Sequence, residues 1–289
     1  MMPVVEGGGS AAGVSREPVY LDAEQLARLH LHLYRVLGEL DRVCEELGIR
    51  YFLIAGSVLG AVRHEGIIPW DDDIDVGLLR RDYDKLLRLG PALFGNGCYL
   101  QTPAAVPLNW GEHAKLRLDG TVYVEYVEDL RMPHRGVFVD IYPLDYLPDR
   151  ALARRAHYAL CRALHVCVFL RCAHTPPRRG GLRGLVRLGL AGALLLVPDA
   201  VLKRLRERVF GWLGDHPTGH IAVITSIYGV KEIFASRVFA SAIPMRLGPL
   251  KVPVPQGWQE YLSQVYGDFM TLPPLEDRRQ HHPVLVFRL

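Results

Sequence analysis

The sequence lacks a long apolar run, a disulfide-rich composition and an excess of turn-forming residues. Its longest apolar stretch, Leu188 to Val197, is far shorter than the roughly 20 residues that a membrane-spanning helix needs. Five cysteines in 289 residues are too few, and odd in number, for a disulfide framework. With 28 Gly and 20 Pro the chain is not of low complexity. These absences argue against a transmembrane, fibrous or disulfide-stapled protein and favour a reducing compartment.

The sequence does contain enough apolar material for a buried core. Hydrophobic residues make up 49% of the chain and charged residues 22%, which argues against disorder. Residues 1–18 have a Gly/Ser stretch where a secretory signal would be apolar, so we expect a flexible N-terminal tail there. We expect residues 19–289 to form a single domain in the cytoplasm, with a peripheral position at the inner face of the membrane as the alternative.

Positive charge is concentrated in one segment. Residues 150–210 hold thirteen Lys or Arg against Asp199 and Glu207, although the net charge of the chain is only +3. We therefore predict a basic helical insert at about 150–215 that meets anions. Within it, residues 182–208 place an apolar run between basic clusters, a pattern typical of a helix that lies on an anionic membrane surface. The alternative is that the apolar run packs on the core while the arginines are solvated.

Hydrophobic periodicity predicts a mixed α/β core ahead of this insert. Apolar residues three and four apart predict a helix over residues 21–48, which ends at Gly48. The other elements that we expect are strands over 51–54, 74–78 and 137–141 and helices over 57–63, 81–89 and 259–266. Ser57 is expected to cap the helix that it begins.

The dipeptide Asp119-Gly120 is a strong turn signal between two alternating segments. Residues 113–118 and 121–127 both have the period of two that is typical of strands. We therefore expect these two segments to pair with each other as a β-hairpin.

An acidic run, Asp71-Asp-Asp-Ile-Asp-Val76, is the most informative part of the sequence. If Ile74 and Val76 point into the core, Asp73 and Asp75 share the opposite face of the strand. Two carboxylates so close repel each other unless a cation lies between them. A hard divalent ion, Mg²⁺ or Mn²⁺, is the natural counter-charge, and such ions bind substrate phosphates.

Three other interpretations of the run are weaker. A solvated acidic loop would not alternate with hydrophobic residues as this run does. A calcium loop counted from Asp71 would need Gly and Glu where the sequence has Val76 and Asp82. Helix capping uses one Asp but not all four. Asp72 alone is expected to be solvated.

A further carboxylate, Asp140, lies in the middle of an apolar strand that has no structural need of an acid. If that strand lies beside residues 74–78, Asp140 completes a site of three carboxylates. It then serves as a metal ligand or takes a proton from an acceptor.

These residues together resemble a known family. The string from Gly56-Ser57 to Asp73-Ile74-Asp75-Val76, followed by a lone Asp on a later strand, resembles the nucleotidyltransferase superfamily of the polymerase β type. The full string is similar to the LicD family of phosphocholine transferases, whose relatives include the fukutin-related alditol-phosphate transferases. The resemblance covers most of residues 30–282 and continues in Lys115-Leu-Arg117, Val139–Asp145, Tyr266-Gly-Asp268 and residues 272–281.

The resemblance implies an α+β fold with a nucleotidyltransferase-like mixed sheet and a helical insert. It implies a metal-dependent transferase that moves a substituted phosphate, such as phosphocholine, from a CDP-linked donor to a hydroxyl of a cell-surface glycan precursor, as in teichoic acid or lipopolysaccharide modification. A nucleotidyltransferase that transfers a nucleoside monophosphate is one alternative, and a non-catalytic glycan- or membrane-binding relative is another. No nucleic-acid partner is expected.

The resemblance also assigns roles to residues. Catalysis and binding of Mg²⁺ or Mn²⁺ are expected of Asp73, Asp75 and Asp140, with Asp71 as a further candidate ligand. Substrate phosphates are expected to contact Gly56 and Ser57, through their backbone N–H groups at a helix N-terminus, and Arg63, His64, Lys115 and Arg117. An ordinary strand–helix turn and surface ion pairs are the alternatives for these contacts.

Overall fold

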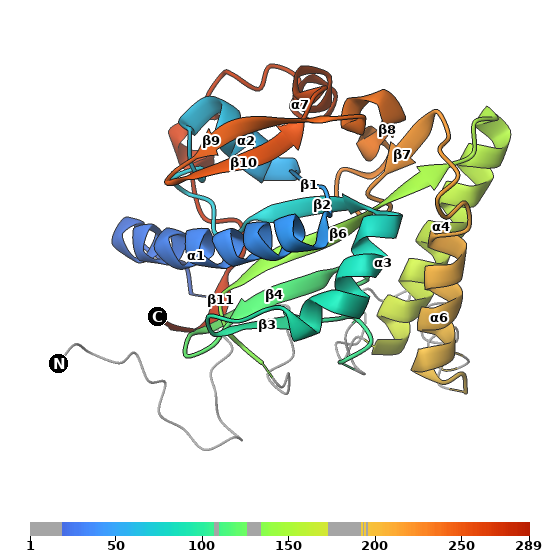
Figure 1. The fold of residues 1–289 in the computed structure, drawn as a ribbon, viewed down its shortest axis with the longest axis horizontal. Coiled ribbons are helices and arrows are strands. Elements are labelled where there is room, and N and C mark those ends of the chain that lie inside the picture. Colours follow the sequence, from blue (N-terminus) through green and yellow to red (C-terminus); the bar gives the residue numbers. More distant parts are fainter. Residues whose placement is uncertain (1–18, 107–109, 126–133, 173–191, 193, 195) are drawn as a thin grey trace.

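The computed structural model describes residues 19–106, 110–125, 134–172, 192, 194 and 196–289. The predicted tail, residues 1–18, lies outside the described residues. Figure 1 shows a curled mixed sheet with helices packed against it and a separate pair of helices, α4 and α6, at one side. The predicted α+β class is therefore confirmed.

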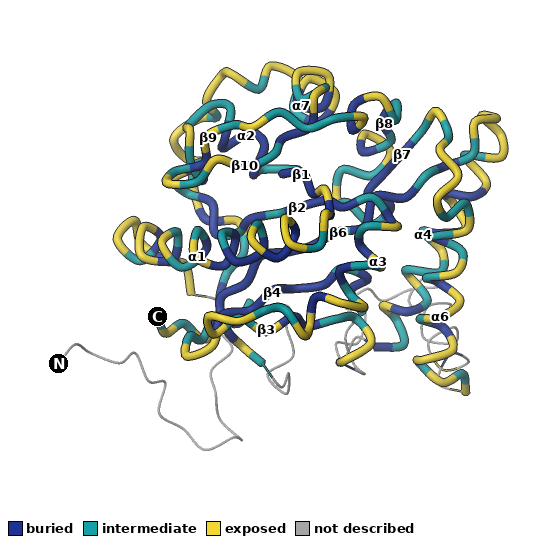
Figure 2. Tube along the Cα trace, viewed as in Figure 1, coloured by how far each residue is buried: buried dark blue, intermediate teal, exposed yellow. Residues whose placement is uncertain are grey.

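The main sheet contains both parallel and antiparallel neighbours. The order of its strands is β1 (Tyr51–Leu53), β2 (Asp75–Leu79), β6 (Phe138–Leu147), β4 (Ala114–Leu118) and β3 (Cys98–Gln101). Strands β2 and β6 are parallel, and the other neighbours are antiparallel. The far end of β6 pairs with β7 (His220–Ala222), which pairs with β8 (Ile233–Ala235). The central strands are buried (Figure 2), as their near-continuous apolar sequences require.

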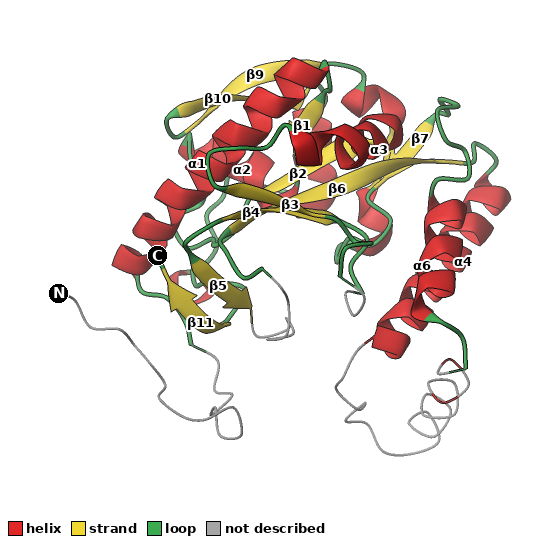
Figure 3. Ribbon diagram, turned by 60° about the horizontal axis from the view of Figure 1, so that its bottom comes forward, coloured by secondary structure: helices red, strands yellow, loops and turns green. Residues whose placement is uncertain are grey.

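Two helices, α1 (Ala23–Leu47) and α3 (Arg80–Leu89), pack on this sheet (Figure 3). Asp22 caps α1 through a reciprocal pair of hydrogen bonds with Gln25. Gly48 ends the helix with a left-handed φ of 59°, a conformation that costs glycine little. The helix predicted over residues 21–48 is thus confirmed.

The remaining elements complete the layer around the sheet. They are α2 (Ala55–His64), the hairpin β9 (Ala242–Leu247) and β10 (Leu250–Pro255), α7 (Trp258–Tyr266), and short 3₁₀ turns at Gly90–Ala92, Gly229–Glu232, Ser236–Phe239 and Leu275–Asp277. The predicted cap at Ser57 is wrong. Helix α2 begins at Ala55, so Ser57 lies within its first turn. The Ser57 hydroxyl does not cap the helix but accepts a hydrogen bond from the Asp75 N–H at 2.8 Å.

The predicted hairpin around Asp119-Gly120 is also wrong. The turn is present, with Gly120 at a φ of +75°. However, the strand after it, β5 (Val122–Glu125), pairs with β11 (Val284–Arg288) near the C-terminus. Strand β4 cannot pair with β5, because β3 and β6 already occupy its two edges.

The described part of the predicted basic insert is helical. Helices α4 (Ala151–Cys172) and α6 (Asp199–Phe210) pack side by side and extend away from the sheet (Figure 3). Residues 173–191, which belong to the same prediction, lie outside the described residues. No helix among the described residues has the length and apolar character required to cross a membrane.

A buried ion pair joins the sheet to α3 and α6. The Arg80 guanidinium donates to both carboxylate oxygens of Asp145, at 2.6 and 2.7 Å, and lies 3.4 Å from Glu207 on α6. The Asp145 side chain is only 2% exposed. Because both charges are shielded from water, the loss of Asp145 leaves Arg80 without its one buried, bidentate partner. Among the described acids, only the more exposed Glu207 and Asp84 then remain near it.

We predict that Asp145→Ala lowers the free energy of unfolding by about 3–5 kcal/mol, the cost of stranding a buried Arg80. Asp84→Ala is the matched control, because Asp84 also faces Arg80, at 3.7 Å, but has a side chain that is 57% exposed. The control should cost less than about 1 kcal/mol. Equal losses for the two variants in urea denaturation would contradict the prediction.

Candidate functional site

The structure places Asp75 and Asp140 directly opposite each other on neighbouring parallel strands. The Asp140 N–H donates to the carbonyl of Ile74 at 2.9 Å, which fixes this register. Ile74 and Val76 are fully buried, so they point into the core, as the alternation of apolar and acidic residues predicted. The prediction that the Asp140 strand lies beside residues 74–78 is confirmed.

Burial and mutual repulsion act on these acids together. Burial and the neighbouring Asp75 raise the pKa of Asp73, and burial and Asp140 raise the pKa of Asp75. Oδ1 of Asp140 is buried and accepts no well-directed hydrogen bond from the described residues. Carboxylate oxygens are the ligands that Mg²⁺ or Mn²⁺ prefers, but among the described residues Asp73 groups within 4.8 Å with Asp72 and His282 and not with Asp75 and Asp140. A divalent cation would relieve the repulsion that raises the pKa values.

Two basic side chains face Asp140 from β4 and the residue before it. Lys115 Nζ lies 3.0 Å from Asp140 Oδ1 and 3.5 Å from Glu125 Oε2, and His113 Nε2 lies 3.4 Å from Asp140 Oδ1. Burial alone would raise the pKa of Asp140, but Lys115 and His113 hold it below its usual value. Lys115 also lies over the ring of Phe138, 3.4 Å from its centroid. The structure thus brings the predicted residue Lys115 to the carboxylates.

Asp72, which we expected to be solvated, is instead buried. Its Oδ2 accepts hydrogen bonds from the Tyr123 hydroxyl at 2.6 Å and from Gln280 Nε2 at 2.8 Å, and its Oδ1 lies 3.1 Å from His282 Nδ1. Burial alone would raise the pKa of Asp72, but these partners hold it below its usual value. The expectation failed because the three partners lie 51 to 210 residues away in the sequence.

Two histidines of the C-terminal segment reach the acidic run. His282 Nδ1 lies 3.5 Å from Asp73 Oδ2, and its bond to Asp72 raises the pKa of His282 to about 9. His281 Nδ1 lies 3.6 Å from Asp71 Oδ1. Among the described residues, Asp72, Asp73 and His282 form a group whose ligand atoms lie within 4.8 Å of one another. The C-terminal segment therefore borders the site, and the family resemblance of residues 272–281 is the sequence signal that points to this segment.

The start of α2 packs tightly against the acidic run. A Cβ on Gly56 would lie 2.8 Å from Asp71 Oδ2, so this carboxylate can approach only because residue 56 is glycine. Asp71 itself is buried. The Ser57 N–H donates to the Ile54 carbonyl at 3.0 Å, within the first turn. Both predicted residues therefore adjoin the carboxylates, and their contact with a substrate phosphate stays a prediction.

Arg63 and His64 lie at the opposite end of α2. Arg63 donates to the carbonyl of Phe269 at 2.9 Å, and His64 packs edge-to-face on Trp70 at 5.7 Å between ring centroids. At 1.5 Å per residue, Arg63 stands about 10 Å along the helix axis from Gly56. The structure does not bring these two predicted residues into contact with the carboxylates.

Arg117, another predicted phosphate contact, is fully buried. Its guanidinium donates to Gln101 Oε1 at 2.8 Å and to the Gly136 carbonyl at 3.1 Å, and it lies 4.8 Å from the centre of the Phe138 ring. In this conformation Arg117 supports the sheet beneath Lys115 and offers no surface to a ligand.

A buried chain of hydrogen bonds holds the first residue of α2. Ala55 has a positive φ of 47°, which is rare for a residue with a Cβ. Its N–H donates to the hydroxyl of Tyr261 at 2.9 Å, and that hydroxyl donates to Glu232 at 3.2 Å. Tyr261 stacks on Phe234 with 4.5 Å between ring centroids. This chain fixes the strained turn that precedes Gly56, and no motif in the sequence indicates it.

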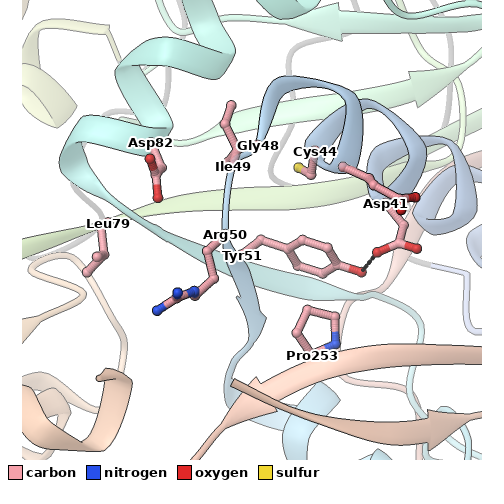
Figure 4. Close-up of a pocket in the computed structure, with 10 residues that line it drawn as sticks. Asp41, Cys44, Gly48, Ile49, Arg50, Tyr51, Leu79, Asp82 and Pro253 are labelled. Carbon is pink, nitrogen blue, oxygen red and sulfur yellow. Dashed lines mark hydrogen bonds between the residues drawn. The ribbon is translucent and has the colours of Figure 1, made fainter. Parts of the chain in front are cut away.

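A pocket of about 710 Å³ lies elsewhere, between the end of α1, β1 and β10 (Figure 4). It is lined by Asp41, Arg50, Tyr51, Asp82 and Pro253 among others, and Tyr51 donates to Asp41 at 2.8 Å. None of its lining residues belongs to the predicted site. The carboxylate site is therefore separate from this pocket.

Comparison with known proteins adds a family resemblance to this arrangement of a strand, a Gly-Ser helix and two parallel strands that carry carboxylates. Residues 48–146 match the family model described as LicD/FKTN/FKRP, nucleotidyltransferase domain. The matched residues contain all the predicted site residues. The predicted resemblance to the LicD family is therefore confirmed.

Individual relatives show the same likeness. The chain is 27% identical over 253 residues to the lipopolysaccharide cholinephosphotransferase LicD of Haemophilus influenzae, a match that spans 86% of this chain and 92% of that protein. It is 46% identical over 54 residues to the human ribitol 5-phosphate transferase FKRP, which is 19% of this chain and 11% of that protein. A protein of Rickettsia prowazekii, RP689, is 39% identical over 61 residues, or 21% of this chain and 23% of that protein.

The buried Glu232 gives a pH prediction. Burial raises the pKa of Glu232 to about 7, so the folded protein takes up a proton that the unfolded chain has lost. Stability is then highest below the unfolded pKa and falls as the pH rises through about 7, by up to about 3 kcal/mol. Glu232→Gln, which keeps an acceptor for Tyr261 without the charge, should be more stable than the wild type at pH 8 and similar to it at pH 5.

Thermal or urea denaturation across this pH range measures the difference. The exposed Glu276→Gln serves as the control and should shift stability by less than about 0.5 kcal/mol at every pH. A Glu232→Gln variant with the same pH profile as the wild type would contradict the prediction.

Proposed function

We propose that this protein is a metal-dependent transferase that moves a substituted phosphate from a CDP-linked donor to a hydroxyl of a cell-surface glycan precursor. The observation that carries the proposal is the opposition of Asp75 to Asp140 on β2 and β6, next to the Gly-Ser turn of α2. The match to a lipopolysaccharide cholinephosphotransferase over 92% of that protein supports a phosphocholine-like group and a glycan acceptor.

The carboxylates would hold the metal. Asp73, Asp75 and Asp140 would bind Mg²⁺ or Mn²⁺, with Asp71 adjoining them, and the bound cation would offset the negative charge of the diphosphate. Asp140 suits the role of ligand better than that of base, because its contacts with Lys115 and His113 stabilise the charged carboxylate. Lys115 would then keep the third ligand in place.

The chemistry is a displacement at phosphorus. The acceptor hydroxyl oxygen attacks the phosphorus that carries the choline-like group, and the bond from that phosphorus to the oxygen of CMP breaks. The hydroxyl proton passes to a base, and CMP leaves with the bonding electron pair. The first turn of α2, held by Ser57 against Asp75, would receive a donor phosphate at the positive end of the helix.

The site would operate in the cytoplasm at the inner face of the membrane. An odd number of cysteines, five in 289 residues, would suit a reducing compartment. The segment 182–208, predicted to lie on an anionic membrane, is described only at residues 192, 194 and 196–208. Its role stays a proposal.

Product analysis separates the candidate activities. The protein would be incubated with Mg²⁺, a glycan acceptor and either CDP-choline or CDP-alditols, and CMP release would be measured. Release of CMP that depends on acceptor supports the proposal. Diphosphate released from a nucleoside triphosphate would identify a nucleotidyltransferase instead, and a lack of turnover with ligand binding intact would identify a binding protein.

We predict that Asp73→Asn or Asp75→Asn lowers turnover at least about a hundredfold, because each removes a charged metal ligand. Both variants should stay folded, since each substitution also relieves repulsion between buried carboxylates. Asp140→Asn should have the same effect on turnover. Asp215→Asn, at an exposed position, is the control and should retain full activity. A variant of Asp73 with near wild-type Mg²⁺-dependent turnover would refute the site.

Asp72→Asn should have a different signature. The asparagine amide keeps one acceptor oxygen, but its NH₂ group replaces the other oxygen and meets a hydrogen-bond donor. We therefore expect the free energy of unfolding to fall by about 1–3 kcal/mol. Turnover should fall less than in Asp73→Asn, because the Asp72 carboxylate is already bonded to Tyr123, Gln280 and His282 and is not one of the proposed metal ligands. Denaturation and CMP release measured on the same preparation test both parts. Unchanged stability would show that the Tyr123 and Gln280 bonds do not matter.

A further inference from the structure

Helix α4 presents an apolar face to solvent as well as to the protein. Its inner face is formed by His157, Tyr158, Cys161, Val168 and Cys172, all buried. The opposite face, at helical spacing, is formed by Leu152, Ala156, Ala159, Leu160, Ala163 and Val166, all exposed. Leu152, Leu160 and Val166 are 80%, 51% and 47% exposed. A surface helix of a monomeric protein normally has polar residues on this face.

The exposed face runs over about four turns. From Leu152 to Val166 the helix rises about 21 Å at 1.5 Å per residue. Exposed stretches of α4 are yellow in Figure 2, on the side of the molecule that is remote from α1. A contiguous apolar surface of this kind marks a site of interaction, whereas single exposed apolar residues need no explanation.

The charged side chains of α4 have one sign. The helix carries Arg154, Arg155, Arg162 and Arg171 and no Asp or Glu. Arg155 is exposed next to the apolar face of α4. On the neighbouring helix α6, exposed Val201 and Leu205 adjoin exposed Arg204 and Arg208. The acids of α6 are half-buried and paired, Asp199 with Lys203 and Glu207 with Arg80 and Arg206. The exposed charges named on the two helices are therefore cationic.

We propose that the outward face of α4 docks the protein onto an anionic lipid bilayer surface. The apolar side chains would enter the boundary between headgroups and acyl chains, and the flanking arginines would contact anionic headgroups. A second copy of the chain is a poorer occupant, because two such faces would bring the exposed Arg155 of each copy together with no carboxylate on α4 to offset the charge. The proposal does not depend on the transferase activity.

Vesicle co-sedimentation tests the proposal without donor or acceptor, so a failure of the proposed activity cannot affect it. The full-length protein should bind vesicles of phosphatidylcholine with phosphatidylglycerol at low salt and bind vesicles of pure phosphatidylcholine much more weakly. Raising NaCl to about 1 M, where the Debye length is about 3 Å, should release most of the protein. An absence of binding to anionic vesicles at low salt would overturn the proposal.

Paired variants place the binding on α4. The double variant Leu160→Glu with Val166→Glu should lose vesicle affinity at least about tenfold, since it introduces charge into the apolar face and repels the anionic surface. The double variant Leu31→Glu with Leu275→Glu makes the same change in net charge at residues that are 68% and 76% exposed on other elements. It should bind within about twofold of the wild type.

Arg155→Gln should weaken binding about fivefold and reduce its salt dependence, as expected for one lost contact with the anionic surface. Circular dichroism and thermal unfolding verify that each variant is folded. Equal vesicle binding by the α4 double variant and the wild type would overturn the proposal. A second result would also overturn it: a wild type that is dimeric and does not bind lipid, together with an α4 double variant that is monomeric. A second copy of the chain would then be the occupant of this face.

Discussion

Repulsion between closely spaced, largely buried carboxylates is the interaction on which the organisation of this site depends. Parallel pairing of β2 with β6 places Asp75 against Asp140, and Asp73 precedes the same strand. The pairing is costly on its own, because burial weakens the solvent screening that would separate the charges. Lys115 and His113 offset part of this charge at Asp140. The remainder calls for a cation, and the chemistry proposed for the protein follows from that need.

Segments that lie far apart in the sequence hold the acids in place, each through a different contact. The Ser57 hydroxyl fixes the start of β2 through the Asp75 N–H. Tyr123 on β5 and Gln280 near the C-terminus hold Asp72. The pairing of β5 with β11 brings the latter two segments together. The C-terminal strand therefore helps to form the site, although it contributes no carboxylate.

Local patterns in the sequence were sufficient for much of this structure. The apolar spacing and Gly48 defined α1, and the alternation around Ile74 indicated which acids share a face. The position of Asp140 beside Asp75 could be predicted because an acid within an apolar strand requires a partner. Each of these inferences depends only on neighbours a few residues away.

Long-range pairing explains the errors. The segments on either side of Gly120 have the pattern of a hairpin, but a pattern cannot show that a C-terminal strand competes for β5. The burial of Asp72 depends on Gln280 and His282, more than 200 residues away. Nor does sequence show that Arg117 is enclosed, because a basic residue on a strand can face either solvent or a buried acceptor.

Strand β6 connects the carboxylates to the helical layer. Asp140 lies near its beginning, and Leu147 at its end packs with Cys161 of α4 and Phe210 of α6. Asp145, between them, binds Arg80. The seven residue steps from Asp140 to Leu147 span about 23 Å along the strand. If α4 rests on a bilayer, this rigid strand fixes how far the carboxylates stand from the anchoring helices, and an acceptor attached to lipid must bridge that distance.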